Sequence, residues 1–336
     1  MPSLPCAELH LHIEGTLEPE LIFTLAARNG IRLPYADTAD LADRYAFTDL
    51  QSFLDLYYAN MDVLRTEADF TDMTRAYLRR TAAAGVRHAE IMMDPQAHLA
   101  RGIALETCVG GVAAALSTSE ADYGISTSLI AAFLRDRPAA EALAVLRDLL
   151  AMEAPIIGIG LDSAEVGYPP SLFAEVYDVA RAAGLKCIAH AGEEGPPGYV
   201  REALDILRVD RLDHGIRCLE DEALVQRLVA DQVPLTVCPL SNVRLRAVAT
   251  LRDHPLPAML ARGLNVSVNS DDPAYFGGYV DDNFSALRQS FGLGVDDLAT
   301  LAANSFRSAF ISGERRAALL AEVEAWRSAP GAAGVA

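Results

Sequence analysis

The stretch Ala7–Gly15 reads AELHLHIEG and places two histidines, His10 and His12, one residue apart in a mostly apolar run. Side chains two residues apart on a β-strand point to the same face of the sheet. Both imidazoles are therefore expected on one side of a strand, where they can hold the same ion. Two hydrogen-bonded core histidines would explain this pair equally well if it stood alone, so the rest of the chain has to decide.

Seven further short apolar runs, separated by helical segments, follow this first strand. Alternating strands and helices favour parallel pairing, and eight such units are the number that closes a barrel. The sequence thus predicts one α/β domain over residues 1–336, a (β/α)8 TIM barrel, with a frayed tail at Pro330–Ala336. The expected strands are Ala7–Ile13, Val86–Asp94, Ile125–Phe133, Ile156–Asp162, Leu185–His190, Arg211–His214, Leu235–Pro239 and Asn265–Asn269.

The segment between the first two expected strands is unusually long, about 70 residues, which is far more than one crossover helix needs. Within it, TDLQSFLDLYYANMDVL opens with a capping-box pattern, Thr48 followed by Gln51, and then repeats apolar side chains at helical spacing. We expect these extra helices to form a lid over one end of the barrel. Helices that pack there without touching a ligand are the alternative.

Composition limits the kinds of partner. The chain carries 46 acidic and 28 basic residues, and its formal charge of -18 repels nucleic acid and anionic membranes, which leaves a small molecule as the expected partner. There is no run of about 18 apolar residues and no signal-peptide pattern. The five scattered cysteines form no CxxC pair and fit reduced thiols. A cytoplasmic protein is expected.

Histidines and carboxylates gather at the carboxyl ends of the expected strands, where the βα loops of such barrels build their active sites. The relevant ends read HLHIEG, HAGEE, LDHG, CPLSN and NSDDP. His10, His12, His190 and Asp271 make a plausible nitrogen and oxygen ligand set for zinc, with water as the remaining ligand. With a third histidine and an SDD sequence at later strand ends, the metal interpretation outweighs that of two core histidines.

A binuclear centre bridged by a carbamylated lysine is the competing kind of metal site. The chain has a single lysine, Lys186, four residues before His190 in the same expected strand. At the rise of a β-strand this places it about 13 Å below the barrel mouth. One metal ion is therefore favoured.

Two side chains are candidates for proton transfer. Glu193 follows His190 by three residues, and a carboxyl group in an enclosed pocket has a raised pKa and can act as a proton donor. His214 ends the sixth expected strand, and we expect it to hydrogen-bond the attacking water. A fourth metal ligand or a core histidine are the alternatives for His214.

Asp271 and Asp272 are adjacent, so they point in different directions if the strand persists that far. One of them can then bind metal while the other faces the substrate. The remaining histidines are expected to be structural, and His98, just past the second strand, is the least certain of them.

The motifs ELHLHIEGT, HAGEE, LDHGIR, CPLSN and NSDDPAYF occur in this order, and from Leu4 to about Phe310 the chain resembles the adenosine and adenine deaminase family of the amidohydrolase superfamily. The resemblance implies a (β/α)8 barrel with one zinc ion. It also implies the following roles: His10, His12, His190 and Asp271 as ligands, Glu193 as proton donor to the purine N1, His214 beside the nucleophile, Asp272 at N7 and the backbone near Ser163 at N3.

The resemblance also bears on the substrate. Nucleoside deaminases typically carry an aspartate in HLDG that reaches the ribose, whereas HIEG here supplies the longer Glu14, which would fill that space. HIEGTLEPE and AEIMMDPQAH look like the adenine deaminase branch. The expected reaction is therefore zinc-dependent hydrolysis of adenine to hypoxanthine and ammonia, as in purine salvage. Deamination of adenosine, deamination of N6-substituted adenines and a catalytically silent purine-binding barrel are the alternatives.

Overall fold

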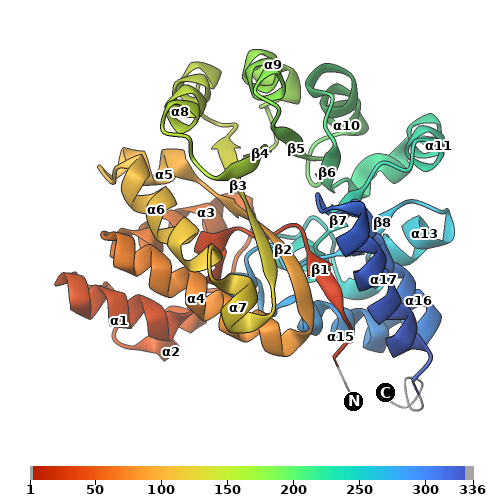
Figure 1. The fold of residues 1–336 in the computed structure, drawn as a ribbon, viewed down its shortest axis with the longest axis horizontal. Helices are drawn as coiled ribbons and strands as arrows, with labels where there is room; N and C mark the ends of the chain where they lie inside the picture. The colour runs from red at the N-terminus through yellow and green to blue at the C-terminus, as the bar shows by residue number, and fades with distance from the viewer. Residues whose placement is uncertain (1–2, 330–336) are drawn as a thin grey trace.

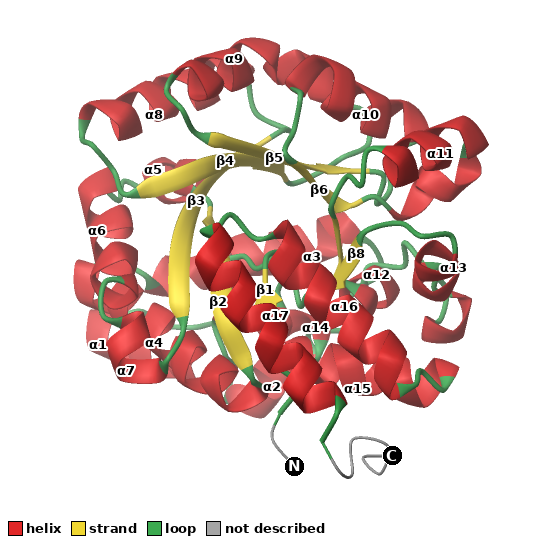
Figure 2. Cartoon of the chain, turned by 45° about the vertical axis from the view of Figure 1, so that its right-hand side comes forward, coloured by secondary structure: helices red, strands yellow, loops and turns green. Residues whose placement is uncertain are grey.

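Eight parallel strands follow one another around the sheet in the order β1 to β8, with helices outside them (Figures 1 and 2). This is the arrangement of a (β/α)8 barrel, and the predicted fold class is confirmed. The structure, a computed structural model, describes residues 3–329, so the expected frayed tail lies outside the described residues. The strands are β1 (Cys6–Glu8), β2 (Val86–Met93), β3 (Ser126–Leu134), β4 (Ile156–Asp162), β5 (Lys186–Ala191), β6 (Arg211–His214), β7 (Leu235–Val237) and β8 (Val266–Val268).

Most helices surround the barrel, as Figure 2 shows. Their buried apolar residues belong to the same hydrophobic core as those of the strands. Several begin with proline in the first turn, where its fixed φ suits a helix and its missing N–H costs no bond. They are α1 (Pro19–Asn29), α2 (Thr38–Asp43), α3 (Leu50–Asn60), α4 (Glu67–Ala84), α5 (Pro95–Ala100), α6 (Leu105–Leu116), α7 (Ser119–Tyr123), α8 (Ala139–Ala151), α9 (Ala174–Ala182), α10 (Pro197–Glu202), α11 (Glu222–Ala230), α12 (Pro239–Arg244), α13 (Leu256–Ala261), α14 (Pro273–Phe276), α15 (Val280–Phe291), α16 (Val295–Ser308) and α17 (Gly313–Arg327).

The barrel closes between its first and last strands through the chain just beyond them. β1 ends at Glu8, earlier than the sequence predicts, but the backbone stays hydrogen-bonded to both neighbours. The His12 N–H donates to the Asp271 carbonyl at 3.0 Å, and the Asp271 N–H donates to the His10 carbonyl at 3.0 Å. On the other side, the Met92 N–H donates to the Leu11 carbonyl at 2.8 Å. The two histidines are thereby fixed at the barrel mouth.

The long connection between β1 and β2 forms α1 to α4, and α3 reaches the mouth. Its start differs from the prediction: Asp49, not Thr48, caps the helix by accepting a hydrogen bond from the Ser52 N–H at 2.8 Å. Phe53 and Tyr57 on α3 line the pocket at the mouth and pack against α14, with ring centroids 4.6 Å apart between Phe53 and Phe276. The extra helices therefore contact the site, as expected of a lid.

Two expectations concern the chain as a whole. All five cysteines are buried and unpaired, in agreement with the predicted reduced thiols. Within residues 3–329, no helix combines the length and the apolar character that a membrane crossing requires.

A buried ion pair joins strands inside the barrel. The Arg211 guanidinium on β6 donates to Glu90 on β2 at 2.6 Å and to the Leu9 carbonyl at 3.1 Å, and both charged side chains are fully buried. The same guanidinium stacks over the Phe310 ring, 4.5 Å from its centroid. Arg211 therefore holds together β2, β6, the chain after β1 and the segment between α16 and α17.

Replacing Arg211→Met is expected to lower the free energy of unfolding by about 3–5 kcal/mol, because Glu90 is left buried without its partner. Urea unfolding followed by circular dichroism measures this loss. The control is Arg227→Met, which breaks a surface pair with Asp205 at 2.7 Å and is expected to cost about 1 kcal/mol or less. Equal losses in the two variants would contradict the structural importance of Arg211.

Candidate active site

The four side chains predicted as metal ligands meet at the mouth of the barrel. His10 Nε2 lies 3.3 Å and His12 Nε2 lies 3.5 Å from Asp271 Oδ1, and His12 Nε2 lies 3.3 Å from His190 Nε2. Ligands placed about 2.0–2.1 Å from a tetrahedral zinc ion are about 3.4 Å from one another. Among the described residues, His10 Nε2 has no hydrogen-bond partner although it is buried. The donor atoms and their spacing fit one divalent ion.

Carboxylates behind the imidazoles hold each ring with Nε2 turned inward. Asp213 lies 3.7 Å from His10 Nδ1 and 3.4 Å from His190 Nδ1, and Asp162 lies 3.4 Å from His12 Nδ1. A carboxylate on the far ring nitrogen fixes the tautomer and the orientation of a metal-binding histidine. Burial acts to raise the pKa of Asp213, but the facing imidazoles hold it below its ordinary value. Sequence reasoning passed over Asp213 because it looks like one more strand residue.

At the end of β6 and just after β8, one residue adopts a left-handed backbone conformation, which directs its side chain toward the proposed metal site. His214 and Asp271 have φ values of 61° and 67°, which are uncommon for residues other than glycine and are often found at active sites. This turn lets Asp213 and His214 both face His10, although they are adjacent. β8 already ends at Val268, so strand alternation does not separate Asp271 from Asp272, contrary to the expectation.

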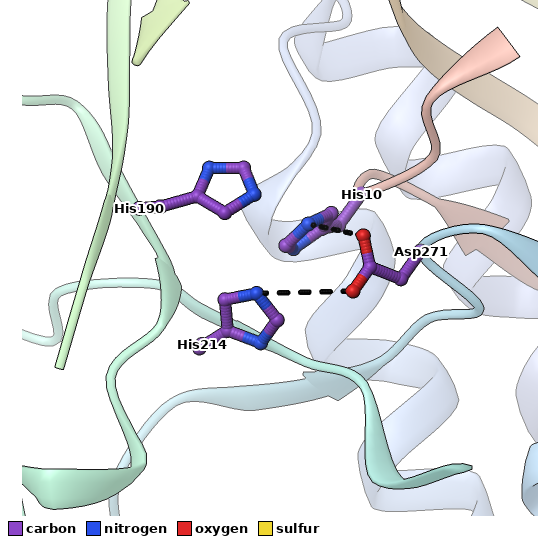
Figure 3. Close-up of side chains that lie close together, drawn as sticks. All are labelled: His10, His190, His214 and Asp271. Atoms are coloured by element: carbon purple, nitrogen blue, oxygen red, sulfur yellow. Dashed lines mark ion pairs between the residues drawn. The ribbon is translucent and has the colours of Figure 1, made fainter. Parts of the chain in front are cut away.

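His214 approaches one carboxylate oxygen of Asp271, Oδ2, whereas His12 approaches the other, Oδ1. Its Nε2 is 3.9 Å from Asp271 Oδ2 and 3.5 Å from Glu193 Oε2, and Figure 3 shows the ring beside His10, His190 and Asp271. Burial and the charge of His10 lower the pKa of His214 well below its ordinary value, which keeps the ring neutral. The imidazole is therefore free to accept a proton between the Asp271 carboxylate and Glu193.

Glu193 is a buried carboxyl group at the pocket wall. Asn242 on α12 donates to its Oε1 at 3.0 Å. Burial raises the pKa of Glu193 well above its ordinary value, and the negative charges of Asp271 and Glu165 raise it further. A carboxyl group in this setting stays protonated near neutral pH and can donate a proton.

Glu165, which sequence reasoning missed, holds the loop that carries Glu193. Its carboxylate accepts hydrogen bonds from four consecutive backbone N–H groups, at 2.6 Å from Gly192, 3.1 Å from Glu193, 2.8 Å from Glu194 and 2.7 Å from Gly195. The backbone of the loop after β5 thus surrounds the buried side chain of Glu165. No local pattern could have indicated this, because Glu165 follows β4 and meets the loop only in the folded barrel.

The three predicted substrate residues fall in two places. Asp272 and Ser163 line the pocket. Glu14 does not: it is buried, faces His98 Nε2 at 2.6 Å and accepts from the Asp94 N–H at 3.2 Å. The prediction that Glu14 contacts the substrate directly is therefore wrong. The turn after His12 directs its side chain behind the pocket wall. His98 is its partner there.

The pocket is bounded by α3 on one side and by polar residues at the strand ends on the other. Leu50, Leu54 and Tyr58 of α3 face Asp94, Asp162 and the site residues, and the space with its open mouth is about 410 Å³. Burial and the adjacent Asp271 raise the pKa of Asp272 well above its ordinary value.

Lys186 lies at the opposite end of β5 from His190, as the strand rise predicts. Its Nζ donates to Asp210 at 3.0 Å and is nearly half exposed. Lys186 therefore cannot bridge two ions at the mouth. Histidine and aspartate side chains are the remaining candidate ligands.

Comparison with known proteins identifies the family. The family model described as adenosine deaminase matches residues 5–326. The chain belongs to the adenosine deaminase family. An adenine deaminase of Streptomyces coelicolor is 62% identical over 96% of both chains. The crystal structure of adenine deaminase from Arthrobacter aurescens is 71% identical, covers 97% of this chain and 100% of its own, and superposes with a TM-score of 0.97.

A more distant family structure bears on the metal. An amidohydrolase from Burkholderia ambifaria with bound Zn is 29% identical, covers 96% of this chain and 90% of its own, and has a TM-score of 0.88. The expected family is thus confirmed. Among the described residues, His10, His190, His214 and Asp271 form a buried group that could hold a metal ion, and His12 forms a second such group with Asp94 and Asp162.

Replacing Glu165→Gln is expected to lower kcat/KM by about 100-fold, because an amide cannot accept all four N–H bonds and Glu193 is displaced from its position. Bound metal per chain, measured on the same samples, is expected to stay unchanged. Glu194→Gln is the matched control, since its side chain takes no part in this network, and is expected to keep full activity. Full activity in Glu165→Gln would show that the loop needs no such anchor.

Proposed function

We propose that this chain is an adenine deaminase that hydrolyses adenine to hypoxanthine and ammonia. The observation that carries the proposal is a buried carboxyl group, Glu193, whose pKa is raised by burial, beside a buried set of three histidines and one aspartate. Relatives that share more than half of their residues with this chain carry the same activity in their names.

We assign one zinc ion to His10, His12, His190 and Asp271, since His10 Nε2 and His12 Nε2 lie 3.3 and 3.5 Å from Asp271 Oδ1 and His12 Nε2 lies 3.3 Å from His190 Nε2. When bound there, zinc supplies a nucleophile at neutral pH by lowering the pKa of a water molecule. The proximity of His214 Nε2 to Asp271 Oδ2, at 3.9 Å, favours a place for this imidazole beside the attacking water.

The proton transfers follow from the protonation states of the side chains. Glu193 gives its proton to N1, so C6 can become tetrahedral without negative charge building up in the ring. Asp271 or the neutral His214 takes a proton from the attacking water, whose oxygen forms the new bond to C6. The C6–N bond then breaks, and the amino group leaves as ammonia after receiving the proton removed from water. The hydroxyl proton left on the C6 oxygen passes to Glu193, which restores the acid and leaves the C6 carbonyl of hypoxanthine.

The remaining contacts orient the base. We assign Asp272, whose pKa is raised, to N7 and the backbone at Ser163 to N3, since both residues line the pocket. We further propose that residues 1–336 act as one catalytic domain in the cytoplasm, which suits the five unpaired cysteines. Recovery of the activity in a membrane or secreted fraction of fractionated cells would contradict this location.

Adenine is expected to be consumed with a higher kcat/KM than adenosine or isopentenyladenine. Parallel spectrophotometric assays of the metal-replete protein, following loss of the aminopurine absorbance, measure the three values. Faster turnover of adenosine would assign a nucleoside deaminase, and faster turnover of isopentenyladenine would assign a deaminase of N6-substituted bases. If none of the three were consumed, a silent purine-binding barrel would replace the proposal.

Replacing Glu193→Gln is expected to lower kcat by about 10²–10⁴-fold, because the amide cannot donate a proton to N1. In the wild-type protein kcat/KM is expected to fall as the pH rises through the raised pKa of Glu193, since the deprotonated form is inactive. That fall should be missing from the residual activity of the variant. Binding of hypoxanthine, measured by calorimetry, serves as the control and should persist; an unaltered pH profile would contradict the assignment.

A further inference from the structure

Two carboxylates in the pocket wall have more acceptor atoms than the protein satisfies. Asp94 and Asp162 line the pocket with only 2% and 3% of their surface exposed. Asp94 Oδ1 and both oxygens of Asp162 have no hydrogen-bond partner among the described residues. The nearest donor is His12 Nδ1, 3.7 Å from Asp94 and 3.4 Å from Asp162.

One imidazole nitrogen cannot satisfy three oxygen atoms. His12 has a single N–H at Nδ1, so it can satisfy at most one of these acceptors. Buried polar atoms are rarely left unpaired, and those that face a pocket are commonly satisfied by its ligand. Asp94 Oδ1 lines the pocket without a hydrogen-bond partner among the described residues, and it lies farther from His12 Nδ1 than Asp162 does.

The order of the strands decides which edge of a bound purine Asp94 meets. Around the barrel, Glu193 follows β5, Ser163 follows β4, Asp94 follows β2 and Asp272 follows β8, which closes on the chain after β1. Around a purine, the ring nitrogens follow one another as N1, N3, N9 and N7. With Glu193 at N1 and Asp272 at N7, as in the proposed function on which this step rests, N9 faces Asp94.

We propose that Asp94 accepts a hydrogen bond from N9–H and so selects the free base against nucleosides. In a nucleoside, N9 carries a carbon substituent instead of hydrogen, so the buried Asp94 would lose its donor and be crowded at the same time. A site built to hydrogen-bond an N–H group rejects an analogue that lacks it strongly. Asp162 serves mainly to orient His12.

This assignment also gives Glu14 a role in specificity that needs no contact with the substrate. Its carboxylate accepts from the Asp94 N–H at 3.2 Å and faces His98 on α5 at 2.6 Å. Glu14 therefore fixes the backbone from which Asp94 projects and the helix that follows it. Glu14 is a positioning residue, and Asp94 makes the contact.

The test compares adenine with 9-methyladenine, in which a methyl group replaces the N9 hydrogen. The wild-type protein is expected to prefer adenine in kcat/KM by about 10⁴-fold, and Asp94→Ala is expected to reduce this preference at least about 100-fold. Calorimetric binding of hypoxanthine and 9-methylhypoxanthine should shift in the same direction without catalysis. Asp94→Asn keeps the shape and a neutral acceptor, so an intermediate preference is expected.

Asp162→Asn is the matched control, because it also weakens a contact to His12 but lies away from N9. It is expected to slow both substrates alike and to leave the preference unchanged. An unchanged preference in Asp94→Ala, with adenine still consumed by the wild type, would overturn the role of Asp94 while leaving the deaminase assignment intact. Loss of a second bound metal ion per chain in Asp94→Ala would instead make His12, Asp94 and Asp162 a cation site. Failure of the wild type to consume adenine would reject the proposed function itself.

Discussion

Closure of the barrel is the constraint on which this site depends. The hydrogen bonds that join the chain after β1 to the chain after β8 run between the backbones of His10, His12 and Asp271, and the side chains of these same residues supply three of the four proposed ligands. Residues separated by about 260 positions can share an ion because the first and last strands are neighbours. Any change that opened this seam would separate the donor atoms as well.

Buried carboxylates hold the functional side chains of this site in position. Asp213 and Asp162 turn imidazoles inward, and Glu165 gathers four N–H groups into the loop that presents Glu193. Each of these carboxylates is buried and makes defined contacts, so the groups around them have few alternative positions. The same burial raises the pKa of Glu193 and lowers that of His214, which is consistent with the proposed roles of Glu193 as proton donor and His214 as proton acceptor.

Free-base specificity, in this view, comes from the strands on the side of the barrel away from the acid. Asp94 after β2 faces the edge of the purine that carries the sugar in a nucleoside, and Glu14 supports it from behind. The difference between HIEG and HLDG then acts through the backbone of the neighbouring strand. A side chain can change substrate choice in this way without reaching the substrate.

The sequence by itself determined the barrel, because eight apolar runs with intervening helices leave few alternatives. It also indicated His10, His12, His190, Glu193 and Asp271, because strand ends converge at the mouth of such a fold. It could not reveal Asp213, Glu165 or the place of Glu14. Their partners lie on other strands, and their directions depend on left-handed turns and on contacts that exist only after the barrel has closed.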